Sequence, residues 1–425
     1  MSLKFSQRIV VTGIGVVSPL GCGSEITWQR LINNQSGVKY LPKELSGDLE
    51  VKIAAQVPSI TEDPYGFDVD SIIEKKFQRK IDRFIHFGLE AARQALTQAQ
   101  WTDLNHEQQH RTATIIGSSI GGINTISNAV QQCVNKGPQS LSPATIPGFL
   151  INMIAGQISI RFGLKGPTGA PSTACTASTQ AIGDGIRMLL TGEVDVALCG
   201  GAESCVERMI LSSFVSSGAV VTKFNETPEK ASRPFSIDRS GFVLGEGAAI
   251  LVIESLEHAV ARGAKPIAEI IGYSACSEAY HPTACKEYGD GLQTAMRGAL
   301  KSAKLDPKDI GYINAHGTST PLGDKSEFFA IREVFGLCDN VSVSSTKSSV
   351  GHLLGAAGSI ETVFTILSLR DGVLPPNLNL EFPDPLFTGL DLVGAQSKRK
   401  TIEYAMTNSA GFGGVNASLV LKRWA

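Results

Sequence analysis

The sequence predicts an α/β protein built from two similar halves, with a functional site between them. Short β-branched runs alternate with longer helical patterns along the chain, which is typical of βαβ units with largely parallel sheets between helices. A Ser/Thr-rich turn occurs twice, at residues 172–175 (Ser-Thr-Ala-Cys) and 345–348 (Ser-Thr-Lys-Ser). Glycine is abundant, at 44 of 425 residues, and residues without bulk let buried helices and sheets pack closely.

The individual elements follow from hydrophobic periodicity and from β-branched content. We expect strands at residues 9–12, 113–116, 194–199, 248–254, 267–272, 310–314, 341–344 and 404–409. We expect helices at residues 81–100, 174–190, 291–303, 326–335 and 354–370. Residues 137–147 and 217–234 are expected to be loop-rich insertions, and no stretch resembles a disordered linker.

The two similar turns are 173 residues apart, and Gly185 and Gly358 share that spacing, although their next neighbours do not match. The residues alone leave chance similarity of Ser/Thr-rich turns and duplication of a half both open. Duplication places a joint near residues 254–265. It divides the chain into an N-terminal half at 1–260 and a C-terminal half at 261–425.

Composition excludes several classes of protein. The 38 Lys and Arg residues against 40 Asp and Glu residues give a net charge of −2, which argues against nucleic acid as a partner. No apolar run reaches the roughly 18 residues of a membrane span, so we expect no membrane insertion. Residues 1–7 have no apolar core of a signal peptide, which favours a cytoplasmic location.

The eight cysteines and seven histidines show no zinc spacing and no disulfide framework, so we expect no metal site. Cys175 stands out by position, because two capping residues precede it and a helix of small residues follows. A helix N-terminus lowers the pKa of a cysteine and favours the nucleophilic thiolate. The competing interpretation is an inert buried cysteine, as we expect for Cys199 and Cys205 in a strand.

Two histidines suit a partner role. His316 lies just past a predicted strand, and His352 lies in the predicted strand-to-helix turn of the second copy, residues 344–352. Each is beside a glycine that allows a ligand to approach. Residues 408–416 (Asn-Ser-Ala-Gly-Phe-Gly-Gly-Val-Asn) surround one aromatic, Phe412, with backbone N–H groups. That pattern indicates an oxyanion hole or a mobile gate, unless it is only a flexible turn.

Four ordered motifs together resemble one family. They are residues 173–178 (Thr-Ala-Cys-Thr-Ala-Ser), 314–324 (Asn-Ala-His-Gly-Thr-Ser-Thr-Pro-Leu-Gly-Asp), 345–352 (Ser-Thr-Lys-Ser-Ser-Val-Gly-His) and 411–414 (Gly-Phe-Gly-Gly). The family is the β-ketoacyl-[acyl carrier protein] synthases, above all the elongating type II enzymes of bacterial fatty acid synthesis. The similarity implies a duplicated thiolase-like fold of five layers, α-β-α-β-α, with two mixed sheets around buried helices.

The resemblance implies an acyltransferase that performs a decarboxylative Claisen condensation with a Cys-His-His set. Cys175 would hold the acyl chain as a thioester, and the backbone N–H groups of Cys175 and Phe412 would form the oxyanion hole. His316 and His352 would stabilise the decarboxylation of malonyl carrier protein. Lys347 matches the active-site lysine of the family and is expected to pair with a carboxylate, Glu361.

The resemblance also implies substrate contacts and partners. Thr318 and Thr320 match positions that bind the phosphopantetheine arm of acyl carrier protein, and Ile120 and Phe214 match positions that line the acyl pocket. The resemblance implies a homodimer, and it implies no permanently bound cofactor. A basic run suits docking of an acidic carrier protein, although it could equally be a solvated helix face; it contains Lys75, Lys76, Arg79, Lys80 and Arg83.

Two positions depart from the family pattern. Ala410 replaces the usual aromatic residue before Gly-Phe-Gly-Gly, and Cys285 stands where the family often has proline. We expect the first change to loosen the gate and alter the chain-length preference. Neither change touches the Cys-His-His set.

Several rival interpretations remain to be tested by the structure. Residues 117–121 (Gly-Ser-Ser-Ile-Gly) match the nucleophile elbow of a serine hydrolase, with Ser119 as the nucleophile. Residues 13–18 (Gly-Ile-Gly-Val-Val-Ser) only approach a dinucleotide-binding fingerprint. A non-catalytic partner subunit typically lacks the nucleophile, and initiating enzymes resemble a Cys-His-Asn set. Cys175 and His352 therefore favour an elongating enzyme.

Overall fold

The two halves of the chain repeat one strand topology. The computed structural model describes residues 3–336 and 340–424. The N-terminal half contributes, in chain order, β1 (Ile9–Ser18), β5 (Thr112–Gly117), β6 (Thr168–Gly169), β7 (Val196–Glu203) and β8 (Gly247–Ser255). These strands lie side by side in the order β6-β5-β7-β8-β1. β5 pairs in parallel with β6 and β7, and β8 is antiparallel to β7 and β1.

The C-terminal half has the same arrangement. Its strands, in chain order, are β9 (Ala268–Ser277), β10 (Ile310–Asn314), β11 (Ser342–Ser344), β15 (Tyr404–Gly411) and β16 (Val415–Arg423). They lie in the order β11-β10-β15-β16-β9. When the five strands of each half are counted in chain order, both halves have the spatial order third, second, fourth, fifth, first. The parallel and antiparallel pairings match those of the first half strand by strand. The predicted duplication of an α/β half is therefore confirmed.

The two sheets are not separate. β1 and β9 pair antiparallel over three residues, so a continuous 12-stranded sheet forms among the described residues, where the sequence suggested two mixed sheets. β13 (Asp391–Leu392) extends it beyond β11, and β2 (Gly21–Cys22) forms a hairpin with β1. Two small ladders join β3 (Lys39–Tyr40) with β4 (Ile53–Ala54) and β12 (Val373–Leu374) with β14 (Lys398–Arg399).

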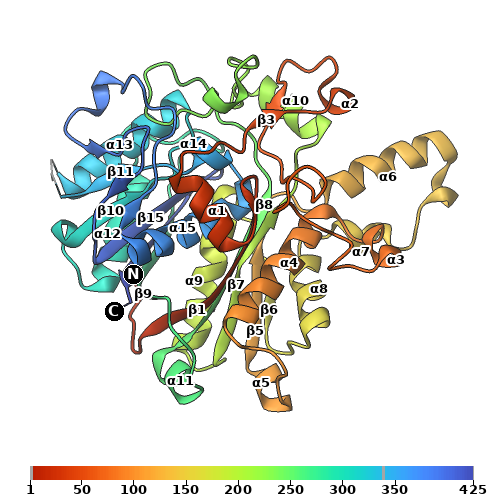
Figure 1. The fold of residues 1–425 in the computed structure, drawn as a ribbon, viewed down its shortest axis with the longest axis horizontal. Coiled ribbons are helices and arrows are strands. Elements are labelled where there is room, and N and C mark those ends of the chain that lie inside the picture. Colours follow the sequence, from red (N-terminus) through yellow and green to blue (C-terminus); the bar gives the residue numbers. More distant parts are fainter. Residues whose placement is uncertain (1–2, 337–339, 425) are drawn as a thin grey trace.

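Helices complete the five layers that the family resemblance implies (Figure 1). α4 (Arg83–Gln98) and α8 (Met153–Phe162) cover the outer face of the N-terminal sheet. α9 (Ala177–Leu190) and α15 (Ala357–Asp371) lie between the two sheets, and α12 (Asp290–Ala303) covers the C-terminal sheet with α13 (Pro321–Phe335) packed on it. Residues 357–369 of α15 are all buried, as expected for a central helix without charged faces.

The remaining helices lie around these layers. They are α1 (Ser24–Ile32), α2 (Lys43–Ser46), α3 (Lys75–Gln78), α5 (His106–His110), α6 (Ile123–Lys136), α7 (Thr145–Phe149), α10 (Arg208–Ser216), α11 (Leu256–Ala261) and α14 (Lys347–Val350). α6 projects away from the sheets, and α3 and α7 lie at its base (Figure 1). In the part of the chain that the structure describes, no helix is long and apolar enough to cross a membrane.

The alignment of the repeat predicted from sequence is wrong, although the duplication is right. Both central helices are preceded by a 3-10 turn, 174–176 before α9 and 354–356 before α15. The first residues of these turns, Ala174 and Leu354, have φ values of 50° and 44°. The structural offset from 174 to 354 is therefore 180 residues, not 173. The second Ser/Thr-rich turn instead precedes the short helix α14, so the sequence match reflected turn composition.

Candidate active site

Three side chains from the two halves meet at the entrance to α9. Cys175 lies in the 3-10 turn before that helix, His316 follows β10, and His352 lies between α14 and the turn before α15. His352 Nε2 is 3.0 Å from Cys175 Sγ, and the two imidazole rings are 5.3 Å apart at an interplanar angle of 86°. One ligand-type atom from each residue lies within 4.8 Å of the others, so all three can contact one carbonyl group, or a thiophilic metal ion.

The backbone around Cys175 is held close to the β15–β16 turn. The Phe412 backbone N–H lies beside the Cys175 thiol, where it lowers the pKa of that thiol. A Cβ atom at Gly411 would lie 3.2 Å from the Cys175 backbone N and 3.0 Å from the Thr173 carbonyl, so glycine permits this close approach. Two backbone N–H groups, those of Cys175 and Phe412, are therefore close to the sulfur. The Phe412 side chain itself is 44% exposed.

The protonation of Cys175 differs from the sequence expectation. Burial raises the pKa of the Cys175 thiol to about 12, while the Lys347 charge and the Phe412 N–H lower this pKa less strongly. The expected lowering by the helix N-terminus is wrong because desolvation of a thiolate outweighs a partial positive charge at a helix end. The thiol is thus protonated at neutral pH. A base must take its proton when the sulfur attacks.

Both imidazoles can act as neutral groups. Burial, together with the nearby Lys347 ammonium, lowers the pKa of His316 and of His352 well below the usual value. Lys347 Nζ lies 3.4 Å from His316 Nδ1, and an ammonium can only donate. His316 therefore accepts at Nδ1 and carries its own proton on Nε2.

Backbone bonds fix the positions of both histidines. Glu327 on α13 accepts the N–H groups of His316 at 2.8 Å and of Gly317 at 2.7 Å. The His352 N–H donates to the Val243 carbonyl at 2.8 Å, and the Phe242 ring packs edge-on against the imidazole at 5.3 Å. Within the described residues, His352 Nδ1 has no hydrogen-bond partner, so either tautomer of this ring is accessible.

The ion pair predicted between Lys347 and Glu361 is present. Both side chains are about 1% exposed, and the Lys347 ammonium bonds one carboxylate oxygen of Glu361. Burial raises the pKa of the Glu361 carboxyl to about 7, against the opposing effect of Lys347. The pair places a positive charge beside His316 without leaving that charge uncompensated in the core.

The predicted substrate residues lie in two groups. The hydroxyl oxygens of Thr318 and Thr320 are 3.0 Å apart, and Thr320 also caps α13 by accepting the Gly323 N–H at 3.2 Å. Ile120 and Phe214 pack against the apolar cluster that contains Cys175. The Phe214 ring meets the Phe242 ring edge-to-face at 5.2 Å, which extends the apolar wall toward His352.

The predicted docking residues lie on one exposed segment at and after α3, apart from the buried site (Figure 1). Acidic side chains accompany them, since Lys75 lies 3.8 Å from Asp70 and Lys76 lies 2.8 Å from Glu74. Arg79 and Lys80 are also exposed. The last member of the basic run, Arg83, instead pairs with the buried Glu246 at 3.0 Å.

The two departures from the family pattern lie close to the turn that carries Phe412. Ala410 is the residue before the turn's first glycine and belongs to β15. The Gly413 N–H donates to the Pro282 carbonyl at 2.7 Å, so the segment that contains Cys285 borders the same turn. The looser gate expected from Ala410 stays a prediction.

Sequence reasoning missed three residues that shape the site. Glu327 looks like a surface acid of an amphipathic helix, yet it is buried beneath His316. Phe242 follows a glycine in the segment between α10 and β8, and Glu203 ends β7. Buried carboxylates that accept several backbone N–H groups carry no short sequence signature, because their partners are distant in the chain.

The structure does not support two of the rival interpretations. The Ser119 hydroxyl donates to the Ala174 carbonyl at 2.8 Å, so its partner is backbone and not an imidazole. Gly13 lies inside β1, where a Cβ atom would come within 2.1 Å of the Ala95 carbonyl of α4. That glycine serves the packing of a helix on a strand and not the approach of a phosphate.

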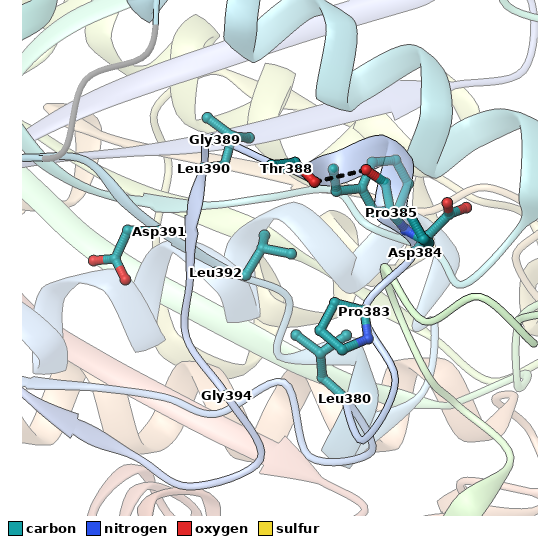
Figure 2. Close-up of a pocket in the computed structure, with 11 residues that line it drawn as sticks. Leu380, Pro383, Asp384, Pro385, Thr388, Gly389, Leu390, Asp391, Leu392 and Gly394 are labelled. Carbon is teal, nitrogen blue, oxygen red and sulfur yellow. Dashed lines mark hydrogen bonds between the residues drawn. The ribbon is translucent and has the colours of Figure 1, made fainter.

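A hollow of about 360 Å³ lies apart from these residues, among residues 380–394 (Figure 2). Figure 2 shows Pro383, Pro385, Leu390 and Leu392 around it. None of the residues proposed for the site from the sequence lines this hollow.

Comparison with known families identifies the chain. Residues 6–259 match the family described as "Beta-ketoacyl synthase, N-terminal domain", and residues 267–381 match its "C-terminal domain". The chain belongs to the beta-ketoacyl synthase family. This beta-ketoacyl synthase is 46% identical to a Rhizobium meliloti protein named "3-oxoacyl-[acyl-carrier-protein] synthase 2" over 98% of the chain and 99% of that protein. It is 43% identical to the Vibrio cholerae protein of the same name, with the same coverage.

Solved structures agree with this assignment. A beta-ketoacyl synthase from Burkholderia phymatum superposes with a TM-score of 0.90 at 33% identity, covering 99% of this chain and 100% of that one. A type II polyketide ketosynthase in complex with its acyl carrier protein and bound to the hexaketide superposes with a TM-score of 0.88 at 28% identity, with the same coverage. The thiolase-like fold expected from the family resemblance is thereby confirmed.

Proposed function

We propose that this beta-ketoacyl synthase is a 3-oxoacyl-[acyl carrier protein] synthase that elongates fatty acids by two carbons, with Cys175 as its nucleophile. The observation that carries the proposal is the meeting of a thiol, two neutral imidazoles and two backbone N–H groups in one buried site. Relatives that match along the whole chain carry the name of this activity.

The first half-reaction transfers an acyl group to the enzyme. His352 Nε2 accepts the thiol proton of Cys175 while Sγ bonds to the carbonyl carbon of the acyl thioester. The N–H groups of Cys175 and Phe412 stabilise the tetrahedral oxyanion. Its collapse breaks the bond from carbon to the phosphopantetheine sulfur, which leaves with the proton from His352. The arm of acyl carrier protein is a substrate carrier, and no permanently bound cofactor takes part.

The second half-reaction forms the new carbon–carbon bond. His316 and His352 donate hydrogen bonds from Nε2 to the thioester oxygen of malonyl carrier protein, which stabilises an enolate as the carboxylate leaves as CO2. The tautomer freedom of His352 allows this change of role. The enolate carbon attacks the acyl-Cys175 carbonyl and forms the new carbon–carbon bond as the bond to sulfur breaks. The Cys175 thiolate then takes up one proton from solvent, which is the proton that the overall condensation consumes. The product is 3-oxoacyl carrier protein, and Lys347 with Glu361 keeps positive charge beside His316.

Further roles complete the proposal. Thr318 and Thr320 bind the phosphopantetheine arm, Ile120 and Phe214 line the acyl pocket, and Phe412 is the gate. The carrier protein docks on the basic segment with Lys75, Lys76, Arg79 and Lys80.

The halves divide near residue 260, the first with the nucleophile and the second with both histidines and the gate. Cytoplasmic location and a homodimer rest on the resemblance to bacterial fatty acid synthases, and light scattering tests the second.

The test is the intact mass of the protein after mixing with acyl carrier proteins of different chain lengths. We expect a stable gain of one acyl group that is absent in Cys175→Ala, and the lengths that load define the pocket. Adding malonyl carrier protein should then remove the acyl group and release 3-oxoacyl carrier protein. A folded protein that gains no acyl mass from any chain would contradict the proposal.

A further inference from the structure

Ser119 contacts the peptide group that carries the proposed oxyanion donor. Its hydroxyl donates a hydrogen bond of 2.8 Å to the carbonyl of Ala174, the residue before Cys175. That carbonyl and the Cys175 N–H belong to one peptide unit. Because a trans peptide is planar and its C=O and N–H point in opposite directions, a bond that fixes the carbonyl also fixes the direction of the N–H.

This peptide needs an external partner. Ala174 has a φ of 50°, in the left-handed region that an alanine adopts at a steric cost. Within the turn, the Ala177 N–H donates a hydrogen bond to the Ala174 carbonyl. The Ser119 hydroxyl adds a second hydrogen bond from another segment, so the strained turn is held from outside as well as from within.

The serine is itself rigidly placed. Its backbone N–H donates to Glu203 Oε2 at 2.6 Å, and the Ser118 hydroxyl donates to Glu203 Oε1 at 3.0 Å. Glu203 is fully buried at the end of β7 and also accepts the Gly355 N–H at 3.1 Å. One carboxylate therefore anchors the loop that presents the Ser119 hydroxyl to the nucleophile turn.

We propose that Ser119 is a positioning residue that aims the Cys175 N–H at the thioester oxygen. Its bond to the carbonyl also polarises the same peptide, which makes the N–H a stronger donor. The inference rests on the proposed function and extends it, because it assigns a role in transition-state stabilisation to a hydroxyl that does not touch the substrate.

The two half-reactions separate this role from a general structural one. Acyl transfer to Cys175 places its oxyanion on the Cys175 N–H, whereas decarboxylation of malonyl carrier protein places negative charge near His316 and His352. Loss of the Ser119 hydroxyl should therefore slow acyl transfer and spare decarboxylation. A general distortion of the site would slow both. An altered acyl pocket would slow some chain lengths more than others, since Ile120 follows Ser119 directly.

The experiment measures both rates in the full-length protein. Cys175 acylation is followed by rapid quench and intact mass, and decarboxylation is followed as acetyl carrier protein formed from malonyl carrier protein without an acyl donor. For Ser119→Ala we expect the acylation rate to fall about tenfold. This fall is smaller than the one expected from loss of an oxyanion donor itself. It should be the same for every acyl chain length that loads. Decarboxylation should stay within about twofold of wild type. Ser119→Thr, which keeps the hydroxyl, should restore acylation.

Ser172→Ala is the matched control. The Ser172 hydroxyl joins the same two segments by donating to the Ser119 carbonyl at 3.2 Å, but it does not touch the peptide before Cys175. This variant should leave both rates unchanged. Ser119→Gly removes the same hydroxyl and replaces Ser119→Ala if the latter does not fold.

Unchanged acylation in Ser119→Ala, a parallel fall of both rates in that variant, or a loss confined to certain chain lengths would each overturn the inference. These outcomes are distinct from failure of the proposed function. That failure would appear in the wild-type protein, as absence of acylation or as acylation that persists in Cys175→Ala.

Discussion

The turns that precede the two central helices have the same shape and different uses. Each is a 3-10 turn that begins with a residue of positive φ, Ala174 in one half and Leu354 in the other. The second residue is Cys175 in the first turn and Gly355 in the second. The Gly355 N–H donates to Glu203, the carboxylate that also holds Ser119. Duplication thus supplied two equivalent positions, of which one holds the proposed nucleophile, Cys175, and the other supports its surroundings.

The difference between the two turns shows why position 355 has no counterpart of the Cys175 side chain. A Cβ atom at position 355 would lie 2.4 Å from the Ser119 backbone N and 2.6 Å from Glu203 Oε2, so no side chain fits there. Around Cys175, by contrast, the C-terminal half provides His316, His352 and the β15–β16 turn. The candidate site is therefore complete only where the halves meet, with Cys175 from the first half and His316 and His352 from the second.

The largest expected effect concerns the contribution of the second half to the first. Replacing His352 by alanine removes the group that we propose accepts the Cys175 proton, and we expect acylation to fall about 10³-fold. His106→Ala, which changes an exposed histidine on α5, should leave the rate unchanged. Stopped-flow or rapid-quench acylation measures both. A fall of less than tenfold for His352→Ala would mean that another group takes the proton.

The next effect tests the supporting turn. Gly355→Ala forces a methyl group against the backbone of Ser119, and we expect it to lower the free energy of unfolding by about 3 kcal/mol. Gly394→Ala is the matched control, because nothing lies within 4 Å of its Cβ position. Urea denaturation gives both values. Equal stability of the two variants would contradict the close packing of this turn on Ser119.

The protonation of Cys175 can be tested by alkylation. Because burial raises the pKa of its thiol, the thiolate fraction should grow about tenfold per pH unit, without a plateau between pH 7 and 9. Iodoacetamide labelling followed by mass measures the rate, and Cys175→Ala corrects for the other cysteines. A plateau below pH 7 would indicate a thiolate–imidazolium pair, as the helix N-terminus alone would favour.

The smallest effect concerns the surface of the first half. Lys75→Ala together with Lys76→Ala should raise KM for acyl carrier protein about threefold at low salt, and the difference should shrink as ionic strength increases. The value is modest because Asp70 and Glu74 already accompany these lysines. Lys308→Ala, an exposed lysine of the second half, is the control. A salt-independent change would argue against electrostatic docking.

The sequence was informative about features that residues close together in the chain specify. All eight expected strands are present, because buried β-branched runs and short turns specify strands locally. The long last strand, β16, was missed because the glycine-rich residues before it suggested a longer loop. The turn between β15 and β16 in fact occupies only the residues between Gly411 and Val415. The projecting helix α6 and the short helices α3 and α7 were also missed, because they carry few or no buried residues.

By itself, the sequence determined the type of fold and singled out Cys175, His316 and His352, since each lies in a short motif beside a strand end or a helix start. The structure brings these three side chains together, and their catalytic roles stay predictions. The tertiary structure decided how these groups behave. Burial reversed the expected pKa shift of the thiol, and the repeat register moved from 173 to 180 residues. Ser119 changed from a rival nucleophile to a partner of the peptide before Cys175. Desolvation and hydrogen-bond partners depend on residues distant in the chain, so spacing along the sequence cannot specify them.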